Sequence, residues 1–515
     1  MFSYIYRLAW VITLCALNLL GFLALEVDAG VLNIQPIAKA SLENKSYDIQ
    51  VKLRDSSKWM KLPAYKAKVR SETFAQSDAA LALLETDGAI DVRITKIRGN
   101  IGQVVIRPLN LKIKAKKIKS NRVEFAMKKP SYVSIEIDGG LYDNIHFFAD
   151  QPEESPILGP AKNVIYFGPG YHLVKEPIVL KNNQTLYLAA GAYVLFDEDF
   201  SDRPSQKGHK GIFEKFPGIR ILAKNINDVT IRGRGIISMI GPEFSSLGGN
   251  TGDPDQVVES HRGIIFDRCN NVLVDGITYL KSSRGWPNTL SYSKGLTYQN
   301  FKMIGSGQNC DGIDINGCED VVVKDSFIRS ADDSITVKSF GDNGANKNHL
   351  YANLTVWNDE ANHPLIVGGE TRGQYFKNIS FDNIDIINFN SPGCLGGAMG
   401  ISAHDNAFIS DITFNNIRVE RMRNKRSRLM KVQVVYNKRW TRTPNTAEYR
   451  GRVRDVTFKN ISSHVFRSSA LKGYDKDHTV ENVVFENIKI KGKKISNKQG
   501  LKLDVKPFVK NVVIK

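Results

Sequence analysis

The sequence has few cysteines for its length, and their number and spacing argue against a zinc site and against a disulfide-stapled fold. Five are present among 515 residues, at Cys15, Cys269, Cys310, Cys318 and Cys394. No C-x-x-C pair of the zinc-binding type occurs, and the number is too small for a disulfide-stapled fold. We therefore expect no metal site and no cofactor. The cysteines are expected either to pack as small buried residues or to include one disulfide.

The sequence also lacks helical periodicity, and its composition is not that of a disordered chain. Hydrophobic residues make up 42% of the sequence and charged residues 24%, which is ordinary for a globular protein. The length of 515 residues suits two or more domains, or one long solenoid with an appended domain.

A long apolar run occurs only near the N-terminus. Arg7 precedes an almost continuously apolar segment over residues 8–25, and Val27-Asp28-Ala29 supplies small residues suited to cleavage. This pattern predicts a secretory signal peptide over residues 1–29. An uncleaved anchor is the alternative, because the run approaches the ~18 residues that span a bilayer. We expect a secreted protein, extracellular or periplasmic, with no stable membrane insertion after cleavage.

Acidic residues are fewer than basic ones, with 53 Asp and Glu against 71 Lys and Arg and a net charge of +18. Basic surfaces attract polyanions, so an acidic polysaccharide is one candidate partner. Nucleic acid is not expected as a partner, because the chain is predicted to be exported and has no aromatic-interleaved RNA-binding motif. The same charge also fits a surface that is merely well solvated. We expect a monomer.

Residues 30–150 show the pattern of a small all-β domain. Short strand-like runs such as Tyr47–Leu53, Ile90–Ile94 and Tyr132–Ile137 alternate with turn residues. Such runs without helices predict a β-sandwich. The segment 152–160 is rich in Pro, Glu and Gly and is expected to be a linker.

A repeat dominates residues 151–515. Each copy has an alternating apolar strand, then Asn or Asp, then an apolar residue, usually Ile. Equivalent positions are separated by 24, 25, 29, 29 and 33 residues, at Val272, Leu296, Val321, Leu350, Ile379 and Ile412. Short strands at such a period predict a parallel β-solenoid in which each repeat is one coil. The repeats are too short for propeller blades of ~40 residues.

Four carboxylates lie in two adjacent repeats. They belong to Asn309-Cys310-Asp311-Gly312-Ile313-Asp314 and to Ala331-Asp332-Asp333-Ser334-Ile335, and Asp311 and Asp332 are 21 residues apart. Since that is close to one coil, and stacked coils are ~4.8 Å apart, the acids are expected on one wall. Such a cluster suits glycoside hydrolysis with inversion, which needs one protonated and one ionised carboxyl ~6.5–9.5 Å apart. The alternatives are Ca²⁺ binding or the capping of turns.

These motifs resemble those of a known family. Asn309–Gly312 and Asp332–Ile335 are similar to the NTDG and DDC-type motifs of polygalacturonases, which are secreted right-handed parallel β-helix enzymes that hydrolyse polysaccharides with inversion. The dextranase group, which resembles them, places a β-sandwich before the same helix, as residues 30–150 are expected to do here. The resemblance implies that Asp332 is the general acid and that Asp311 and Asp333 hold and activate water. It leaves Asp314 as a supporting or turn residue. Because Asp332 and Asp333 are adjacent, a bend is expected between them.

The chain departs from the polygalacturonase pattern around these acids. Asn362-His363-Pro364 stands where that family has Gly-His-Gly, and the Arg-Ile-Lys motif that grips a substrate carboxylate is not found. His363 is the candidate to replace the family histidine, and Lys338 the candidate to supply a substitute charge. Asn309 and Trp357 complete the predicted substrate-binding residues. Trp286 and Trp357 are each either sugar-stacking platforms or core residues.

The sequence therefore predicts a hydrolase of an α-linked polysaccharide, either pectin-like or dextran-like. Two alternatives remain open. A polysaccharide lyase on a similar helix would need a cation and a Lys or Arg base, and a glycan-binding solenoid would have no turnover.

Overall fold

The computed structural model describes residues 30–70, 76–196, 219–239, 263–282, 285–307, 309–391, 397–438 and 440–515. The predicted signal peptide and Cys394 lie outside these residues. No helix in the described part of the chain is long and apolar enough to cross a membrane. Its helices are single 3₁₀ turns at η1 (Ala40–Leu42), η2 (Leu109–Leu111) and η3 (Ala447–Tyr449).

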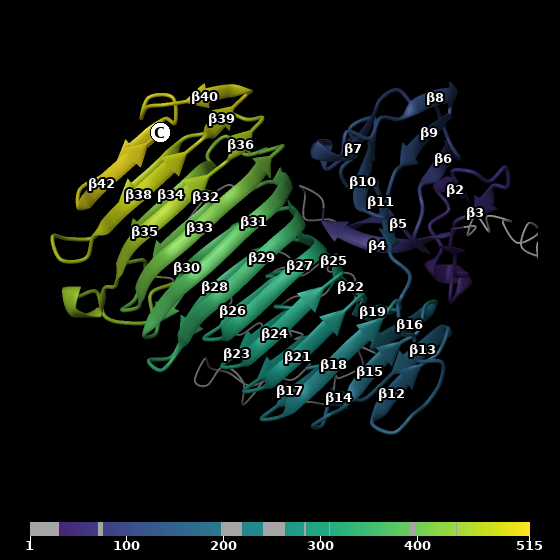
Figure 1. Cartoon of the computed structure of the whole chain (residues 1–515), viewed down its shortest axis with the longest axis horizontal. Coiled ribbons are helices and arrows are strands. Elements are labelled where there is room, and N and C mark those ends of the chain that lie inside the picture. The colour runs from purple at the N-terminus through teal and green to yellow at the C-terminus, as the bar shows by residue number, and fades with distance from the viewer. Residues whose placement is uncertain are drawn as a thin grey trace, which may run out of the picture.

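The N-terminal domain is a sandwich of two mainly antiparallel sheets (Figure 1). One sheet contains β1 (Leu32–Asn33), β4 (Ala64–Arg70), β5 (Gln76–Thr86), β7 (Val104–Arg107), β10 (Tyr132–Ile137) and β11 (Ile145–Asp150). The other contains β2 (Tyr47–Leu53), β3 (Met60–Lys61), β6 (Ile90–Lys96), β8 (Lys116–Lys119) and β9 (Arg122–Met127). Buried residues alternate along β2 and β6, so the inner faces form a shared apolar core.

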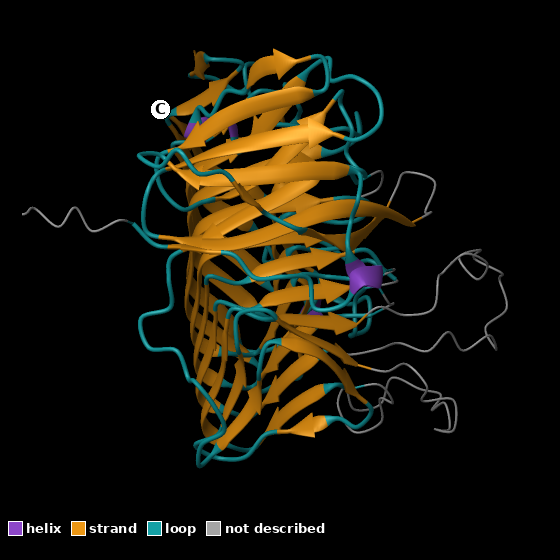
Figure 2. Cartoon of the chain, turned by 90° about the vertical axis from the view of Figure 1, so that its right-hand side faces the viewer, coloured by secondary structure: helices purple, strands orange, loops and turns teal. Residues whose placement is uncertain are grey.

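The rest of the chain winds into two long sheets whose strands are parallel in nearly every pair (Figures 1 and 2). The longer sheet contains β12 (Val164–Phe167), β13 (Gly170–Val174), β15 (Thr185–Leu188), β16 (Ala192–Phe196), β18 (Asn227–Gly233), β19 (Ile236–Met239), β21 (Asn270–Asp275), β22 (Thr278–Lys281), β24 (Lys294–Gln299), β25 (Lys302–Gly305), β27 (Glu319–Ser330), β29 (Ala345–Asn358), β31 (Tyr375–Phe389), β33 (Phe408–Val419), β35 (Arg452–Lys459), β36 (Ser462–Ser463), β38 (Val480–Glu486), β39 (Ile488–Ile490), β40 (Lys493–Ile495) and β42 (Val509–Ile514).

The shorter sheet contains β14 (Ile178–Val179), β17 (Ile221–Lys224), β20 (Ile264–Asp267), β23 (Asn288–Ser291), β26 (Ile313–Asn316), β28 (Ile335–Phe340), β30 (Leu365–Arg372), β32 (Gly397–Ala403), β34 (Arg428–Val434), β37 (Ser469–Lys472) and β41 (Leu503–Val505). The chain passes from one sheet to the other in every coil. The predicted fold, a β-sandwich followed by a right-handed parallel β-helix, is confirmed.

Asparagine and aspartate make the repeated turns of the longer sheet. Asn348, Asn378 and many equivalent residues have a positive φ, between 50° and 60°, which Asn and Asp adopt more readily than other residues with a side chain. The amide of Asn348 also donates to Asp320 at 2.8 Å, and that of Asn378 donates to Asn348 at 2.9 Å. Each coil is therefore hydrogen-bonded to the previous one at its turn.

Stacked aromatic rings run through the C-terminal half of the helix core. Successive ring centroids lie 4.7, 4.8, 5.1 and 5.2 Å apart, and the rings are those of Tyr351, Phe381, Phe414, Phe458 and Phe485. Each ring is on the strand partner of the one before, so the strand register brings the rings together. The stack is fully buried and adds aromatic contacts to the area that each coil removes from water.

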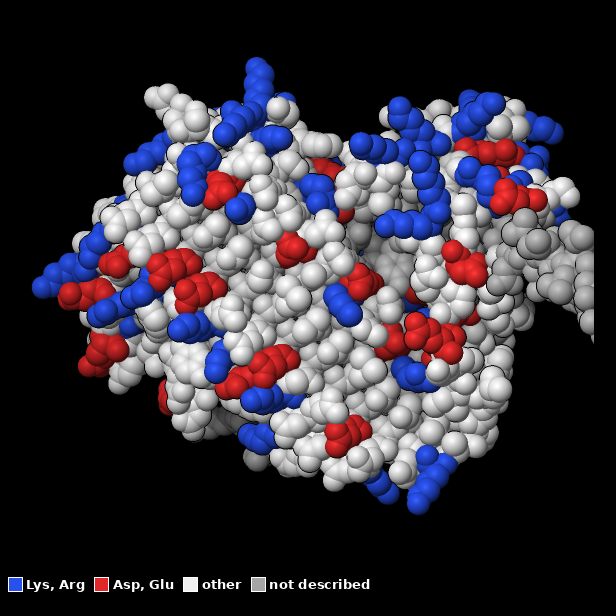
Figure 3. All heavy atoms as spheres, viewed as in Figure 1, with Lys and Arg blue, Asp and Glu red and all other residues white. Residues whose placement is uncertain are grey.

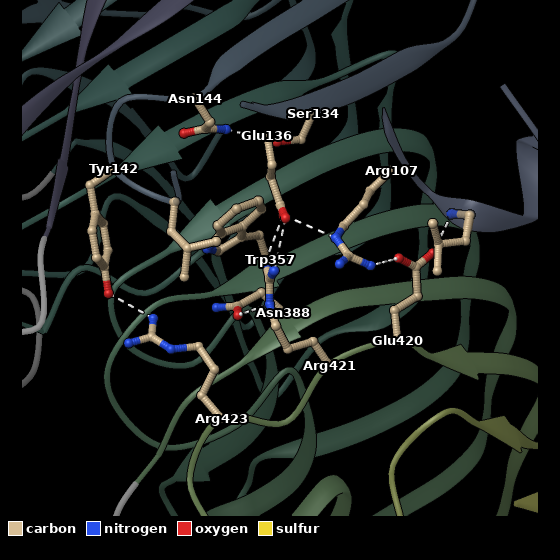
Figure 4. A network of polar contacts seen from close by, with 12 residues as sticks. Arg107, Ser134, Glu136, Tyr142, Asn144, Trp357, Asn388, Glu420, Arg421 and Arg423 are labelled. Atoms are coloured by element: carbon tan, nitrogen blue, oxygen red, sulfur yellow. Dashed lines mark hydrogen bonds and ion pairs between the residues drawn. The ribbon is translucent and has the colours of Figure 1, made fainter. Parts of the chain in front are cut away.

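The two domains meet through buried charges as well as apolar side chains. Glu136 of β10 accepts hydrogen bonds from Arg421 at 2.7 and 2.9 Å, and Arg107 pairs with Glu420 at 2.6 Å (Figure 4). Lys302 of β25 pairs with Asp150 at 2.7 Å. A buried charge left without its partner is costly, so these pairs fix how the sandwich sits on the helix.

Charged side chains are distributed unevenly over the molecular face drawn in Figure 3. Lys and Arg gather over the sandwich and over the C-terminal coils, while acidic and basic residues alternate across the middle of the helix. The exposed strand β8, with Lys116, Lys117 and Lys119, belongs to the basic area on the sandwich.

Candidate active site

The acidic motifs lie on neighbouring coils of the shorter sheet. Asp311 precedes β26 and the Asp332-Asp333 pair precedes β28, and these strands are parallel neighbours in which Ile313 pairs with Ile335. Backbone hydrogen bonds join the two turns, from the Gly312 N–H to the Asp333 carbonyl at 2.7 Å and from the Asp332 N–H to the Cys310 carbonyl at 3.1 Å. The turns that carry the acids are therefore held side by side.

Glycine is required at position 312 by this close approach. A Cβ atom there would lie 2.0 Å from the Ser334 carbonyl oxygen and 2.7 Å from the Ile328 Cγ2 atom. Any side chain would force the two coils apart, and with them Asp311 and Asp333. The glycine of the N-x-D-G motif thus keeps the acids together.

A bend places Asp332 and Asp333 at the mouth of the coil. The residues between the end of β27 at Ser330 and the start of β28 at Ile335 form bends, as expected for two adjacent acids that face one cleft. The Ser330 hydroxyl, 2.7 Å from the Asp332 carbonyl and from Ser334, holds this bend. The Asp333 N–H donates to the Asp332 carboxylate at 2.9 Å.

Two side chains of the following coil hold the acids from the other side. The Asn362 amide donates to Asp332 Oδ1. The His363 N–H donates to Asp333 Oδ1 at 2.8 Å, and its ring Nδ1 lies 2.7 Å from the same oxygen. The histidine predicted as a replacement for the family residue thus contacts one of the acids directly.

A buried lysine lies beneath the acids. Lys338 Nζ is 2.7 Å from Asp314, 3.7 Å from Asp311 and 3.9 Å from the centre of the Trp286 ring, and Lys338 is 3% exposed. Burial alone would lower the pKa of Lys338, but Asp314, Glu370 and Asp311 outweigh it and raise that pKa. Asp314, expected to be a supporting or turn residue, is a fully buried strand residue that pairs with this lysine.

The carboxyl groups around the lysine do not behave like surface acids. Burial, followed by the charges of Asp314 and Asp332, raises the pKa of Asp311 well above its usual range. Burial and the neighbouring Asp333 raise the pKa of Asp332 to about 7. The site can therefore keep a carboxyl group protonated near neutral pH, which a general acid requires.

The acids open into a pocket of about 460 Å³. Of the predicted residues, Asn309, Asp311, Asp332, Asp333, Lys338 and His363 line it. Trp286, Asn362, Glu370 and Trp440 line it as well. No group of three or more His, Cys, Asp and Glu among the described residues is arranged to hold a metal ion.

Trp357 does not belong to the pocket, which corrects the prediction that it binds substrate. Its side chain is 0% exposed and packs between the two domains (Figure 4). Its indole N–H donates to Asp359 at 2.6 Å. The Arg329 guanidinium lies 4.3 Å from its ring centre. The outer face of β29 would be exposed in an isolated helix, but here the sandwich covers it.

Sequence reasoning missed Glu370 and Trp440. Glu370 is a buried residue in β30 whose carboxylate lies 3.4 Å from Arg442. Trp440 belongs to a long connection between β34 and β35 that is tied down by Asp405, which accepts hydrogen bonds at 2.8 Å from the Arg442 N–H and the Thr443 hydroxyl. The extra length of this coil was the available signal, but length alone does not show which side chain faces the acids.

The chain is similar to known proteins in sequence and in fold. Residues 206–505 match the family described as glycosyl hydrolases family 28. A probable polygalacturonase of Arabidopsis thaliana is 25% identical over 162 residues, which is 31% of this chain and 33% of that protein. The match thus spans about a third of that curated relative.

Among solved structures, Dex49A from Penicillium minioluteum is similar over 93% of this chain and 96% of its own, with a TM-score of 0.61 and 15% identity. A polygalacturonase from Erwinia carotovora ssp. carotovora covers 66% of this chain and 86% of its own, with a TM-score of 0.49 and 16% identity. At this identity, the likeness to Dex49A shows that the two chains share a fold along almost their whole length.

Proposed function

Since the chain belongs to glycosyl hydrolases family 28, we propose that it hydrolyses an α-linked polysaccharide with inversion at the anomeric carbon, with Asp332 as the general acid. The observation that carries the proposal is the meeting of Asp311, Asp332 and Asp333 in one pocket, on adjacent coils, where the pKa of Asp332 is raised to about 7. Inverting hydrolysis needs such a set of carboxyl groups.

Each acid has a distinct part in this proposal. Asp332, with a pKa of about 7, donates its proton to the glycosidic oxygen as the bond to the anomeric carbon breaks. A water molecule held by Asp311 and Asp333 attacks that carbon from the opposite side and passes a proton to Asp333. Asp333 suits this step because the His363 N–H donates to it and its side chain is 15% exposed. Asp333 then releases its proton to solvent and Asp332 regains one, which returns both carboxyl groups to their starting states.

The surroundings of Lys338 favour a neutral, dextran-like substrate over a pectin-like one. Lys338 was the predicted substitute for the cation that grips a uronate, but it is buried and pairs with Asp314 at 2.7 Å. A lysine in that position balances buried carboxylates and is not available to a substrate carboxylate. Trp286 and Trp440 line the same pocket, and indole rings are suited to stacking on uncharged sugar rings.

The decisive test is to incubate the protein with a panel of polysaccharides and to measure new reducing ends. The panel should contain dextran, other α-glucans and polygalacturonate, and proton NMR of the first-formed product reports the anomer. We expect reducing ends from an α-glucan, with the inverted β-anomer appearing first. The absence of new reducing ends from every glycan would refute hydrolysis, while an initial α-anomer would refute inversion. Asp332→Asn is the matched control for a contaminating activity.

The first alternative, a polysaccharide lyase, is disfavoured by the protonated state of Lys338. A lyase base must be unprotonated to remove a proton next to a uronate, but the carboxylates around Lys338 raise its pKa and keep it protonated. The product separates the two reactions, since a lyase product absorbs in the near ultraviolet and a hydrolase product does not.

Export remains part of the proposal and rests on the sequence of residues 1–29. Amino-terminal sequencing of the exported protein is expected to begin at Gly30. Retention in the cytoplasm of its native host, with Met1 still attached, would contradict it.

A further inference from the structure

We infer that the N-terminal sandwich takes part in catalysis by positioning the acids through the segment 359–363. This inference rests on the proposed roles of Asp332 and Asp333. The segment 359–363 connects β29 to β30 and has the acids on one side and the sandwich on the other. Loops of this kind are usually free to move, but this segment is held on both sides by hydrogen bonds and ion pairs.

On the inner side, the segment holds both acids. Asn362 donates to Asp332, and His363 contacts Asp333 through its N–H and its ring. The Ala361 N–H also donates to the Ala331 carbonyl at 3.0 Å, next to Asp332. A shift of the segment would therefore move the carboxyl oxygens with it.

On the outer side, the first anchor is Arg329. Its guanidinium pairs with Asp359 through two nitrogens, at 2.7 and 3.1 Å, and donates to the sandwich at the Asn144 side chain and the Leu141 carbonyl, each at 2.9 Å. It also lies 3.0 Å from the ring of His146. Arg329 is fully buried, so this link between sandwich and segment is shielded from water.

The second anchor, Arg70, comes from the sandwich itself. It ends β4 and pairs with Glu360 at 2.5 Å, and Arg70 is 8% exposed. Burial raises the pKa of Glu360 to about 7, and Arg70 acts in the opposite direction. Arg70 thus reaches across the domain boundary and holds the residue two positions before Asn362.

Both anchors are positioning residues, because neither touches the pocket that the acids line. The residues that hold an acid must themselves be fixed if the acid is to stay in a productive place. A misplacement of about 1 Å can reduce turnover by about 100-fold. The sandwich is accordingly expected to affect kcat without binding the reacting sugars.

The test compares Arg70→Met with Lys68→Met in the full chain. Lys68 lies on the same strand β4 and pairs with Asp78, whose side chain is 37% exposed, so its removal leaves the segment untouched. We expect Arg70→Met to lower kcat by about 10-fold to 100-fold with little change in KM, and Lys68→Met to leave both unchanged. Arg70→Lys should restore part of the lost kcat.

A double-mutant cycle with Glu360→Gln adds a check on the pair. If Arg70 acts through Glu360, the double variant should be no slower than the slower single variant, because both changes break one contact. Equal losses in Arg70→Met and Lys68→Met, or a change in KM with kcat unaltered, would overturn the inference.

Hydrogen exchange provides a readout that needs no activity. Amide exchange in residues 359–363 is expected to become about 10-fold faster in Arg70→Met and to stay unchanged in Lys68→Met. If the parent protein cleaves no glycan but this exchange pattern appears, the proposed function fails while the positioning holds. If the parent protein is active and exchange does not change, the positioning fails alone. Should Arg70→Met not fold, Glu360→Gln takes its place in both measurements.

Discussion

Replacing Lys338 by Met tests whether this lysine holds the acidic pocket together. Methionine matches its length and keeps the apolar part of the side chain, but removes the charge that lies 2.7 Å from Asp314 and 3.7 Å from Asp311. Removing one partner of a buried ion pair costs about 3–5 kcal/mol, because the other charge stays buried without compensation. We expect a loss of that size in the free energy of unfolding of the helix domain at pH 8.

The loss should be smaller at pH 5. Asp311 and Glu370 have raised pKa values in the folded protein, and Lys338 opposes that rise in both. Unfolded Asp and Glu titrate near ~3.9 and ~4.3, so these groups destabilise the fold progressively as the pH rises above those values. Without Lys338 their folded pKa values rise further and the penalty at high pH grows. At pH 5, protonation of the carboxyl groups removes part of this penalty.

Urea unfolding followed by tryptophan fluorescence at pH 5 and pH 8 measures both effects. Lys377→Met is the matched control, because Lys377 lies on a strand of the same helix, is 58% exposed in its side chain and is 4.0 Å from Asp411. It should lose less than about 1 kcal/mol, with little dependence on pH. A loss in Lys338→Met that is equally small, or equal at both pH values, would refute the reasoning.

Other changes at the site and around it have expected outcomes of their own. Asp332→Asn should reduce kcat by at least ~10²–10⁴-fold while calorimetry still detects glycan binding, and unaltered turnover would exclude it as the acid. In the parent protein kcat/KM should fall as the pH rises through about 7, since the acid loses its proton there; a profile still rising at pH 8 would contradict this assignment. Trp286→Ala should raise KM, as measured with the glycan found in the panel. Trp357→Ala should instead cost about 3–5 kcal/mol in urea unfolding and leave KM unchanged, since it packs between the domains.

The fold could be predicted because each coil repeats the same local chemistry. Asparagines such as Asn353 and Asn383 recur after alternating apolar positions, and the structure gives them the positive φ that this pattern predicts. The position of Asp311 beside Asp333 followed from the same repeat, because stacking converts a separation of one coil into a contact between neighbours. Periodicity carries such information across the whole helix.

The rest of the site depends on contacts that no period encodes. Trp357 has the sequence surroundings of an outward-facing strand residue, and only the docking of the sandwich buries it. Lys338 was expected to serve the substrate, but the depth of its side chain and the proximity of Asp314 give it a buried charge to balance. Trp440 reaches the pocket on a long irregular connection, whose path is set by the hydrogen bonds that Asp405 accepts.

The aromatic stack has a consequence for how the protein can change. Its rings at Phe381, Phe414, Phe458 and Phe485 are 33, 44 and 27 residues apart in sequence, yet successive rings remain about 5 Å apart. The 44-residue step contains the connection that carries Trp440. The packing of the stack thus depends on the strand position of each ring and not on the length of chain between successive rings. Cleft loops can therefore be lengthened, shortened or exchanged without disturbing the stack, so that recognition of a new sugar can evolve separately from stability.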